Sequence, residues 1–387
     1  MTELQQLINE LCPNGVKFAA LEECCKILDN KRKPVTKAAR QAGEYPYYGA
    51  NGIQDYVSDY IFDGIFVLVG EDGSVVTPSG NPVVNWATGK IWVNNHAHII
   101  EEKDGVLLRY LYHYLQTVNV SALIHGNIPK LTGGDFRAIK VPVPPLPVQS
   151  EIVRILDNFT ELTAELTAEL TARKQQYAHY RDTLLKLDNN VPSYTLKDIC
   201  LSIADGDHMP PPKADSGVPF ITISNITETR QIDFSNVMYV PREYYDKLAD
   251  KRKAKRDDIL YTVVGSFGIP VHISSKTEFV FQRHIAILRP NQQMIVPRYM
   301  YHIMQSTEFY KQADKAAKGA AQRTIGLSSL GNMTIPLPSI EEQKRIVAIL
   351  DRFDTLCNDI SAGLPAEIEA RQKQYEYYRD KLLSFRR

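Results

Sequence analysis

Several short stretches carry residue types found in enzyme active sites, and none has a complete pattern. An adenine methyltransferase needs an Asn- or Asp-Pro-Pro-aromatic motif, of which Asn81-Pro-Val-Val and Met209-Pro-Pro-Pro have only parts. A P-loop needs GxxxxGK followed by Ser or Thr, and Gly89-Lys90-Ile91 fails on both sides. Glu342-Gln343-Lys344 has a nuclease-like acid–lysine spacing, but acidic residues are also expected at a helix start. The sequence therefore predicts a chain without catalytic residues.

The histidines and cysteines do not have the spacing of a metal site. His96 and His284 lie in equivalent positions beside β-like runs, without cysteine or carboxylate partners at ligand spacing, so we interpret them as structural. The five cysteines include the adjacent pair Cys24 and Cys25 and no CxxC motif. They are typical of reduced thiols in a cytoplasmic protein, and we expect neither a metal nor a disulfide.

Two long stretches of nearly the same sequence must position whatever the chain binds. They are Pro142–Leu187 and Pro336–Phe385, and in both the apolar residues recur at steps of three and four. This spacing predicts a long helix with one apolar stripe. The economical partner for each stripe is the other copy, packed as an antiparallel coiled coil; two unrelated core helices are the alternative. The second copy contains Gly363-Leu-Pro365, which predicts a kink or short break.

The segments before the long helices are duplicated as well. Arg109–Gln116, which we expect to be helical, recurs as Arg298–Gln305, and the β-like Ile65–Gly73 resembles Leu260–Gly268. In these last two stretches Gly70 and Gly73, like Gly265 and Gly268, indicate tight turns better than a phosphate cradle. Residues 201–216 and the basic run Lys251–Arg256 have no counterpart in the first half.

We therefore expect an α+β protein with two mixed α/β globular domains, separated by two long helices and related by a pseudo-twofold axis. The predicted boundaries are 1–141 and 188–335 for the domains and 142–187 and 336–387 for the helical regions.

The composition excludes few classes of function. The 387 residues include 45 Lys and Arg and 45 Asp and Glu, and a net charge of zero neither favours nor excludes nucleic acid. No apolar run approaches the roughly 20 residues of a membrane span, so we expect no membrane partner.

At this point the sequence resembles the specificity subunits of type I restriction-modification systems, over essentially the whole chain. The match is carried by six stretches: Pro144–Gln149, Ile152–Asp157 and Tyr177–Leu185 with their second copies Pro336–Pro338, Ile346–Asp351 and Tyr375–Leu383. Tyr47–Ile53 and Val67–Gly73 are also typical of the target recognition domains of that family.

The resemblance implies a non-catalytic subunit that binds double-stranded DNA. Each recognition domain would read one half of a bipartite target, and the helices would fix the gap and dock two modification (methyltransferase) subunits. Restriction subunits that translocate and cleave DNA would join them. The resemblance places S-adenosylmethionine, ATP and Mg on the partner subunits and no cofactor in this chain. The alternative is a protein-interaction scaffold, with duplicated heads on a coiled coil and no role in binding DNA.

One tetrad, Glu161-Leu-Thr-Ala, recurs at Glu165 and Glu169. It resembles the helical spacer repeats of one subgroup of the family, whereas a plain helix surface with a Leu every four residues is the alternative. Four residues of helix are about 6 Å long, which is near two base-pair rises of about 3.4 Å.

The residues expected to touch DNA follow from chemistry and loop position. The loops His125–Leu131 and Lys318–Thr324 are expected to correspond and to face DNA, because both precede the same framework strand. Phosphates need Lys or Arg, and base edges are read by Arg, Lys, Asn, Gln or Ser on groove-facing loops. Plain solvated surface is the alternative for each of them. In the first domain the candidates are Lys31, Arg32, Lys33, Asn51, Gln54, Ser74, Trp86, His125, Asn127 and Lys130. In the second they are Asp207, His208, Lys213, Asn225, Lys251, Arg252, Lys253, Lys255, Arg256, Lys318 and Arg323.

Overall fold

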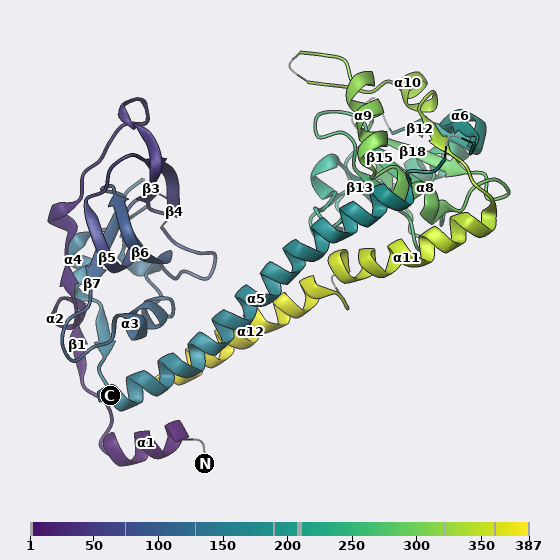
Figure 1. Ribbon diagram of the computed structural model, residues 1–387. Coiled ribbons are helices and arrows are strands. Elements are labelled where there is room, and N and C mark those ends of the chain that lie inside the picture. Colours follow the sequence, from purple (N-terminus) through teal and green to yellow (C-terminus); the bar gives the residue numbers. More distant parts are fainter. Residues whose placement is uncertain are drawn as a thin grey trace. The chain divides into compact units, whose positions relative to one another are not determined.

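The computed structural model describes residues 3–73, 75–127, 129–188, 190–206, 211–320, 322–359 and 361–385. The chain forms two compact units, each shown with its helices in Figure 1. The first unit is Met1–Glu165 with Glu369–Arg387, and the second is Leu166–Ile368. Both long helical regions therefore contribute residues to both units.

The first unit is built on a six-stranded sheet in the order β2-β7-β5-β6-β3-β4. Its central strand β5 has the continuous apolar run expected of a strand covered on both faces, and its last five residues are all buried. The unit contains α1 (Glu3–Leu11), β1 (Phe18–Ala20), α2 (Leu21–Cys24), β2 (Lys26–Ile27), η1 (Asp29–Lys31), η2 (Lys37–Ala39), β3 (Ala42–Gly49), β4 (Gly52–Val57), β5 (Phe62–Gly70), β6 (Val84–Val93), β7 (Ala97–Glu101), α3 (Leu108–Leu115), η3 (Ser121–Leu123), β8 (Ile124–His125), β9 (Lys130–Leu131), α4 (Gly133–Ala138), β10 (Lys140–Pro142) and the first part of α5 (Leu146–Leu184).

The second unit has a four-stranded sheet in the order β12-β18-β15-β16 and a three-stranded sheet in the order β14-β13-β17. It contains the rest of α5, then β11 (Ser193–Thr195), α6 (Leu196–Ile199), β12 (Cys200–Asp205), β13 (Val218–Ile221), η4 (Ile223–Asn225), β14 (Met238–Val240), α7 (Arg242–Asp246), η5 (Asp250–Arg252), β15 (Ile259–Thr262), β16 (Pro270–His272), β17 (Val280–Phe281), β18 (Ile285–Pro290), α8 (Pro297–Ile303), α9 (Thr307–Ala316), α10 (Leu327–Gly331), β19 (Thr334–Pro336) and α11 (Ile340–Asn358), followed by the start of α12 (Leu364–Leu382).

The two units share one strand plan. The parallel pair β3 and β6 of the first unit corresponds to the parallel pair β13 and β17 of the second. Strand β6, which is one strand of ten residues, corresponds to two separate strands, β16 and β17. The break explains why the second unit has two smaller sheets where the first has one. The predicted α+β fold with duplicated mixed domains is confirmed.

The backbone register corrects one detail of the sequence comparison. Glu71 N donates to His96 O over 2.8 Å, and Val263 N donates to His284 O over 2.8 Å. Since the two histidines are equivalent, Glu71 matches Val263 and Gly73 matches Gly265. The expected pairing of Gly70 with Gly265 was wrong by three residues, because two apolar β runs can be aligned in several registers. Both Gly73 (φ 85°) and Gly265 (φ 69°) have left-handed backbone, as a tight turn requires.

A second correction concerns residues 201–216, for which no counterpart was expected. Strand β12 pairs with β18 as β2 pairs with β7, and Ile203 lies opposite Leu288 as Ile27 lies opposite Ile100. The segment specific to the second unit therefore begins only after Asp205. A β-bulge between Cys200 and Ser202 shifts the register by one residue, which hid the similarity.

Each globular core is completed by helical residues from both repeats. In the first unit the core includes Ile152 and Leu156 of α5 and Tyr375 of α12. In the second it includes Tyr177 of α5 and Leu350 of α11. Stacked aromatic rings join the antiparallel helices, Phe159 on Tyr378 at 5.3 Å in the first unit and Tyr180 on Phe353 at 5.4 Å in the second. Figure 1 shows α12 ending beside the start of α5. The predicted antiparallel pairing is confirmed within each unit.

The break predicted in the second long region is also present. Helix α11 ends at Asn358 and α12 begins at Leu364, with Pro365 in its first turn. Proline lacks an N–H group, and this position of a helix does not need one. Among the described helices, none is both long enough and apolar enough to cross a bilayer.

Candidate nucleic-acid interface

Most first-unit residues that were expected to touch DNA gather around the turn that follows β5. Gly73 N donates to Pro129 O over 3.0 Å, which places the loop of residues 125–130 beside this turn. Asn94 Nδ2 donates to Gln54 Oε1 over 3.3 Å and therefore ties the β3–β4 hairpin to the segment before β7. Lys33 N donates to Val93 O over 3.3 Å on the same segment. The loop of residues 125–130, the β3–β4 hairpin and the segment with Lys33 thus meet in one region.

A buried set of charges lies beneath this region. We call Asp29, Arg32, Glu71, His98 and Lys130 the charged cluster. Arg32 contacts Glu71 at 2.5 Å and Asp29 at 3.6 Å, and Lys130 Nζ lies 3.1 Å from Glu71. His98 Nδ1 lies 2.7 Å from Asp29, and its Nε2 lies 3.0 Å from Leu131 O. Burial alone would raise the pKa of Asp29, but the His98 hydrogen bond and the nearby Arg32 charge hold it below its ordinary value.

Three members of the charged cluster have the ligand types of a metal site. One ligand atom each from Asp29, Glu71 and His98 lie within 4.8 Å of one another. The positive charge that a metal ion would bring is already supplied by Arg32 and Lys130. Both ring nitrogens of His98 also face oxygen acceptors of the protein. The donor set therefore fits an internal ion-pair network better than a cation site.

The remaining first-unit candidates divide by exposure. Arg32 is held in the charged cluster, with only 12% of its side chain exposed. Trp86 packs edge-on against Tyr112 at 5.7 Å, beneath the Arg109 guanidinium at 4.7 Å, so its ring belongs to the framework. Ser74 lies outside the described residues. The exposed candidates are Lys31, Lys33, Asn51, Gln54, His125, Asn127 and Lys130.

In the second unit, the loop of residues 318–324 occupies the place of residues 125–130. Gly265 N donates to Arg323 O over 3.0 Å, as Gly73 N donates to Pro129 O. The Arg323 guanidinium lies 2.7 Å from Asp314 and 5.1 Å from the centre of the Phe267 ring. Lys318 is exposed. The predicted equivalence of the two loops is thus supported by matching backbone hydrogen bonds.

The basic run Lys251–Arg256 does not join that loop. Arg252 binds Asp205 at 3.2 Å, and Lys255 binds Asp250 at 2.9 Å. Lys255 and Arg256 lie just before Ile259, where β15 begins. Val264 lies just beyond the other end of β15 and pairs with Thr324 of the loop. The two basic groups of the second unit therefore lie toward opposite ends of one strand. Lys253 Nζ donates to Asp246 O over 2.9 Å, and Lys251 and Arg256 are exposed.

The other second-unit candidates have different surroundings. Lys213 is exposed. Asn225 is buried; its Oδ1 accepts from Thr222 N at 2.9 Å and its Nδ2 donates to Asn236 O at 3.1 Å, so it holds a local loop together. Asp207 and His208 lie outside the described residues.

The sequence comparison missed one His–Tyr–Asp set of hydrogen bonds in each unit, which joins the globular domain to the long helices. We call each of these two sets a latch. His113 Nδ1 lies 2.9 Å from Tyr375 Oη, and its Nε2 lies 2.8 Å from Asp157. Burial lowers the pKa of His113, although Asp157 acts in the opposite direction. Because the carboxylate can only accept, Nε2 donates to it, and Nδ1 of the neutral ring accepts from the tyrosine hydroxyl.

The second latch repeats this arrangement. His302 Nδ1 lies 2.8 Å from Tyr177 Oη and its Nε2 lies 2.6 Å from Asp351. Burial likewise lowers the pKa of His302. In each unit the tyrosine comes from the helix of the other repeat. The shared Tyr and Asp of the two repeated helices were visible in the sequence, but nothing there indicated which domain each would meet.

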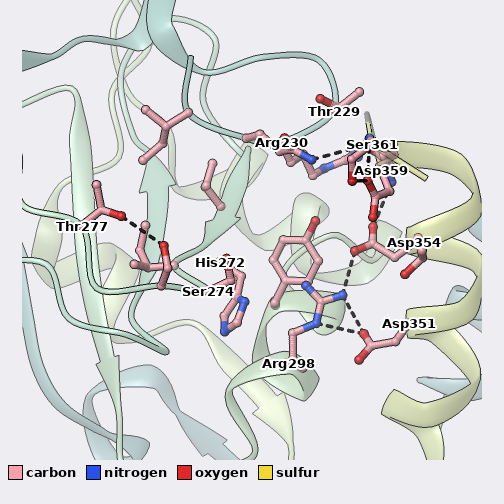
Figure 2. A pocket seen from close by; sticks show the side chains of 18 of the residues that line it. Thr229, Arg230, His272, Ser274, Thr277, Arg298, Asp351, Asp354, Asp359 and Ser361 are labelled. Atoms are coloured by element: carbon pink, nitrogen blue, oxygen red, sulfur yellow. Dashed lines mark hydrogen bonds and ion pairs between the residues drawn. The ribbon is translucent and has the colours of Figure 1, made fainter. Parts of the chain in front are cut away.

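A cavity of about 610 Å³ lies beside the second latch, between α11 and the sheet (Figure 2). Arg298 is fixed there by Asp351 at 2.6 Å and Asp354 at 2.7 Å. His272 lines the cavity and pairs with Ile259, as Trp86 pairs with Val67 in the first unit. The cavity thus lies where a histidine replaces the larger indole ring.

Comparison with known proteins identifies relatives of the whole chain. The family described as "Type I restriction modification DNA specificity domain" matches residues 13–173 and 189–370. A protein of Haemophilus influenzae named as a type I restriction enzyme specificity subunit is 38% identical over 386 residues, covering 96% of both chains. The EcoR124I/EcoR124II specificity subunit of Escherichia coli is 37% identical over 303 residues, covering 73% of this chain and 72% of that one.

A solved structure shares the fold. The S subunit of a type I restriction-modification system from M. genitalium superposes with a TM-score of 0.57 at 15% identity, covering 96% of this chain and 97% of that one.

Proposed function

The chain belongs to the family of type I restriction-modification specificity subunits, and from this premise we propose how its parts divide the work of recognising DNA. Each unit reads one half of a bipartite double-stranded target through the loops at the equivalent turns Gly73 and Gly265. The single observation that carries this proposal is the gathering of exposed Lys, Asn, Gln and His side chains around the first of these turns. The family match favours this role over a protein scaffold that does not bind DNA.

The chemistry of the candidate residues supports the proposal. The ammonium groups of Lys31 and Lys33 suit phosphates, whereas the side chains of Asn51, Gln54 and Asn127 can donate to and accept from base edges. A phosphate contact supplies affinity without sequence preference, and an amide paired with a base supplies the preference. In the second unit Lys318 takes the first role. The exposed Lys251 and Arg256 lie away from that loop, and we propose that they contact the DNA backbone on its flank.

We further propose that the chain supplies recognition and leaves the chemistry to its partners. Two modification subunits that use S-adenosylmethionine would dock on the helical regions, and restriction subunits that use ATP and Mg would complete the assembly. The spacing between the two half-sites would be set by α5, α11 and α12. The incomplete catalytic motifs of the sequence support this division.

Methylation mapping tests the proposal. A host that expresses this chain with its cognate modification subunit should carry a split adenine-methylated motif, and the motif should disappear when the chain is deleted. The map would also give both half-sites and the gap. If the methyltransferase is expressed and active but no split motif depends on this chain, the proposal is wrong and the result favours the protein-interaction scaffold.

A further inference from the structure

We propose that the charged cluster is a positioning device for recognition by the first unit: it holds the side chain of Lys130 toward a base edge, and it holds the segment with Lys31 and Lys33 where these two lysines meet phosphates. This inference rests on the proposed function and assigns residues that carry it.

The charged cluster joins four separate segments. Asp29 and Arg32 follow β2, Glu71 follows β5, His98 lies on β7, and Lys130 lies on β9. Arg32 also donates to Ala97 O over 2.6 Å, and Asp29 Oδ1 accepts from Ile99 N at 3.0 Å. A single set of ion pairs therefore fixes η1 and the loop of residues 125–130 to the same end of the sheet.

His98 makes the centre of the charged cluster rigid. Its side chain is only 1% exposed, and its ring is stacked on Phe136 with centroids 4.2 Å apart. Since both ring nitrogens have partners, the ring has no freedom to turn without breaking a hydrogen bond. Asp29, which binds this ring, is in turn fixed in direction.

The second unit shows that the fold itself does not need the charges of Glu71, His98 and Lys130. The position of Asp29 keeps a carboxylate there, because Asp205 lies opposite Ala286 and pairs with Arg252 at 3.2 Å. The equivalent positions for Glu71, His98 and Lys130 hold Val263, Ala286 and Thr324. The backbone bonds are nevertheless the same, since Leu131 N donates to Glu71 O and Ile325 N donates to Val263 O, both over 2.8 Å. Uncharged side chains thus support the same strand geometry within this chain.

Stability alone does not account for the charged cluster. The side chains of Asp29, Arg32 and Glu71 are 11%, 12% and 11% exposed, so each loses most of its hydration on folding. Replacing buried ion pairs by well-packed apolar residues is often neutral or stabilising, and the second unit has the apolar Val263 at the position of Glu71. What the charged cluster holds in addition is the segment after β2, which carries the exposed Lys31 and Lys33.

Lys130 connects the charged cluster to the solvent. Its side chain is 46% exposed, whereas the other four members are 12% exposed or less. Its ammonium group is aimed by Glu71 at 3.1 Å and by Asp72 at 3.9 Å. A charge that is fixed before DNA arrives costs less side-chain entropy on binding than a free lysine.

The test replaces Glu71 by Gln in the full chain, assembled with its modification subunits. Initial methylation rates are measured on duplexes that carry single base-pair substitutions in either half of the mapped motif. We expect Glu71→Gln to lower discrimination by about tenfold in one half-site only, because Lys130 would no longer be held against its base edge, and the loss of a base contact costs about tenfold or more in discrimination. Discrimination in the other half-site should stay unchanged. Glu71→Asp, which keeps the charge, should restore part of the loss.

A matched control comes from the same unit. Glu101 forms an exposed ion pair with Lys26 at 3.2 Å, on the far end of β7. Glu101→Gln removes a carboxylate without touching the charged cluster, and it should leave both half-sites unchanged. If Glu71→Gln behaves like this control, or if it weakens both half-sites equally, the positioning role is wrong.

Thermal unfolding of each variant separates a positioning role from misfolding. Should Glu71→Gln unfold, Lys130→Met replaces it, since this change leaves the buried carboxylates with Arg32 and His98. The same half-site should lose discrimination, and an unchanged profile would overturn the inference. Failure of the proposed function looks different, because the unaltered chain would then direct no split motif at all.

Discussion

At the scale of single residues, the two units use one backbone to hold different side chains. Trp86 and His272 occupy the same strand position, as do Glu71 and Val263. The first replacement opens a cavity and the second removes a buried charge. Duplication thus left the framework hydrogen bonds in place, while the side chains around the turns took different chemistry in each unit.

The exposed lysines of the first unit should act on phosphates. Lys33→Ala is expected to weaken DNA binding by the assembled complex about equally on all sequences, and to lower the slope of log affinity against log salt by about 1. The slope is measured by titrating DNA at several salt concentrations. Lys26→Ala, which breaks an exposed ion pair elsewhere on the unit, serves as the control. An unchanged slope for Lys33→Ala would remove this lysine from the interface.

The two latches should contribute to stability in the same way. Tyr375→Phe and Tyr177→Phe each remove the hydroxyl that donates to a buried histidine, and each should lower the free energy of unfolding by about 1–2 kcal/mol. Denaturant unfolding measures the change. Tyr377→Phe on the exposed face of α12 is the matched control, since its side chain is 61% exposed. Loss in only one of the two variants would show that the latches are not equivalent.

Four histidines, two of them in the latches, predict how the free energy of unfolding depends on pH. Burial lowers the pKa of His113 and His302, and the pKa of His272 and His284 is lowered as well. The unfolded chain therefore binds more protons than the folded chain once the pH falls below about 6.5. The stability contribution is complete above that pH and decreases as the pH falls toward the lowered values. Unfolding free energies that stay constant from pH 7 to pH 5 would contradict this.

Carboxylates in the latches act at lower pH. The pKa of Asp157 and Asp351 is lowered, because their histidine and arginine partners outweigh the effect of burial. Their contribution is present above the ordinary carboxyl pKa of about 3.9 and is lost as the pH falls through the lowered values. The free energy of unfolding is therefore expected to decrease over two separate pH ranges as the pH falls, first through the histidines and then through these carboxylates.

At the scale of elements, the junction between α11 and α12 is set by close packing. A Cβ atom built on Gly363 would lie 2.5 Å from Thr355 O and 2.7 Å from Asp359 O, so the backbone would have to move. Gly363→Ala should cost about 1–3 kcal/mol of unfolding free energy, as overpacking of a tight site does. Gly326→Ala meets nothing within 4 Å and is the control, for which the change should stay below about 1 kcal/mol. Equal effects of the two changes would mean that the junction is loose.

At the scale of the whole molecule, the helical regions are expected to set the gap between half-sites. Inserting one further Glu-Leu-Thr-Ala tetrad after Ala172 would lengthen α5 by about 6 Å. The methylated motif should keep both half-sites and gain about two base pairs in its gap. Mapping the motif of the insertion variant checks this. A gap that does not change would show that the tetrads are helix surface without a spacing role.

The sequence by itself determined the duplication, the helical regions and the family. The strand β5 and the break before Pro365 were predictable because apolar spacing, proline and glycine act through the local chain. The same holds for the pairing of the loop of residues 125–130 with that of residues 318–324, since both precede the same framework segment.

Only the tertiary structure decided which parts meet. Tyr375 and Tyr177 each complete the core of the unit built mainly from the other repeat, and a repeated sequence looks the same whichever copy it packs against. Arg32 appeared as one of three adjacent basic residues, but long-range ion pairs to Asp29 and Glu71 bury it while Lys31 and Lys33 remain exposed. Burial and ion pairing depend on segments that are far apart in the chain, and neither spacing nor composition records which distant segment will be the neighbour.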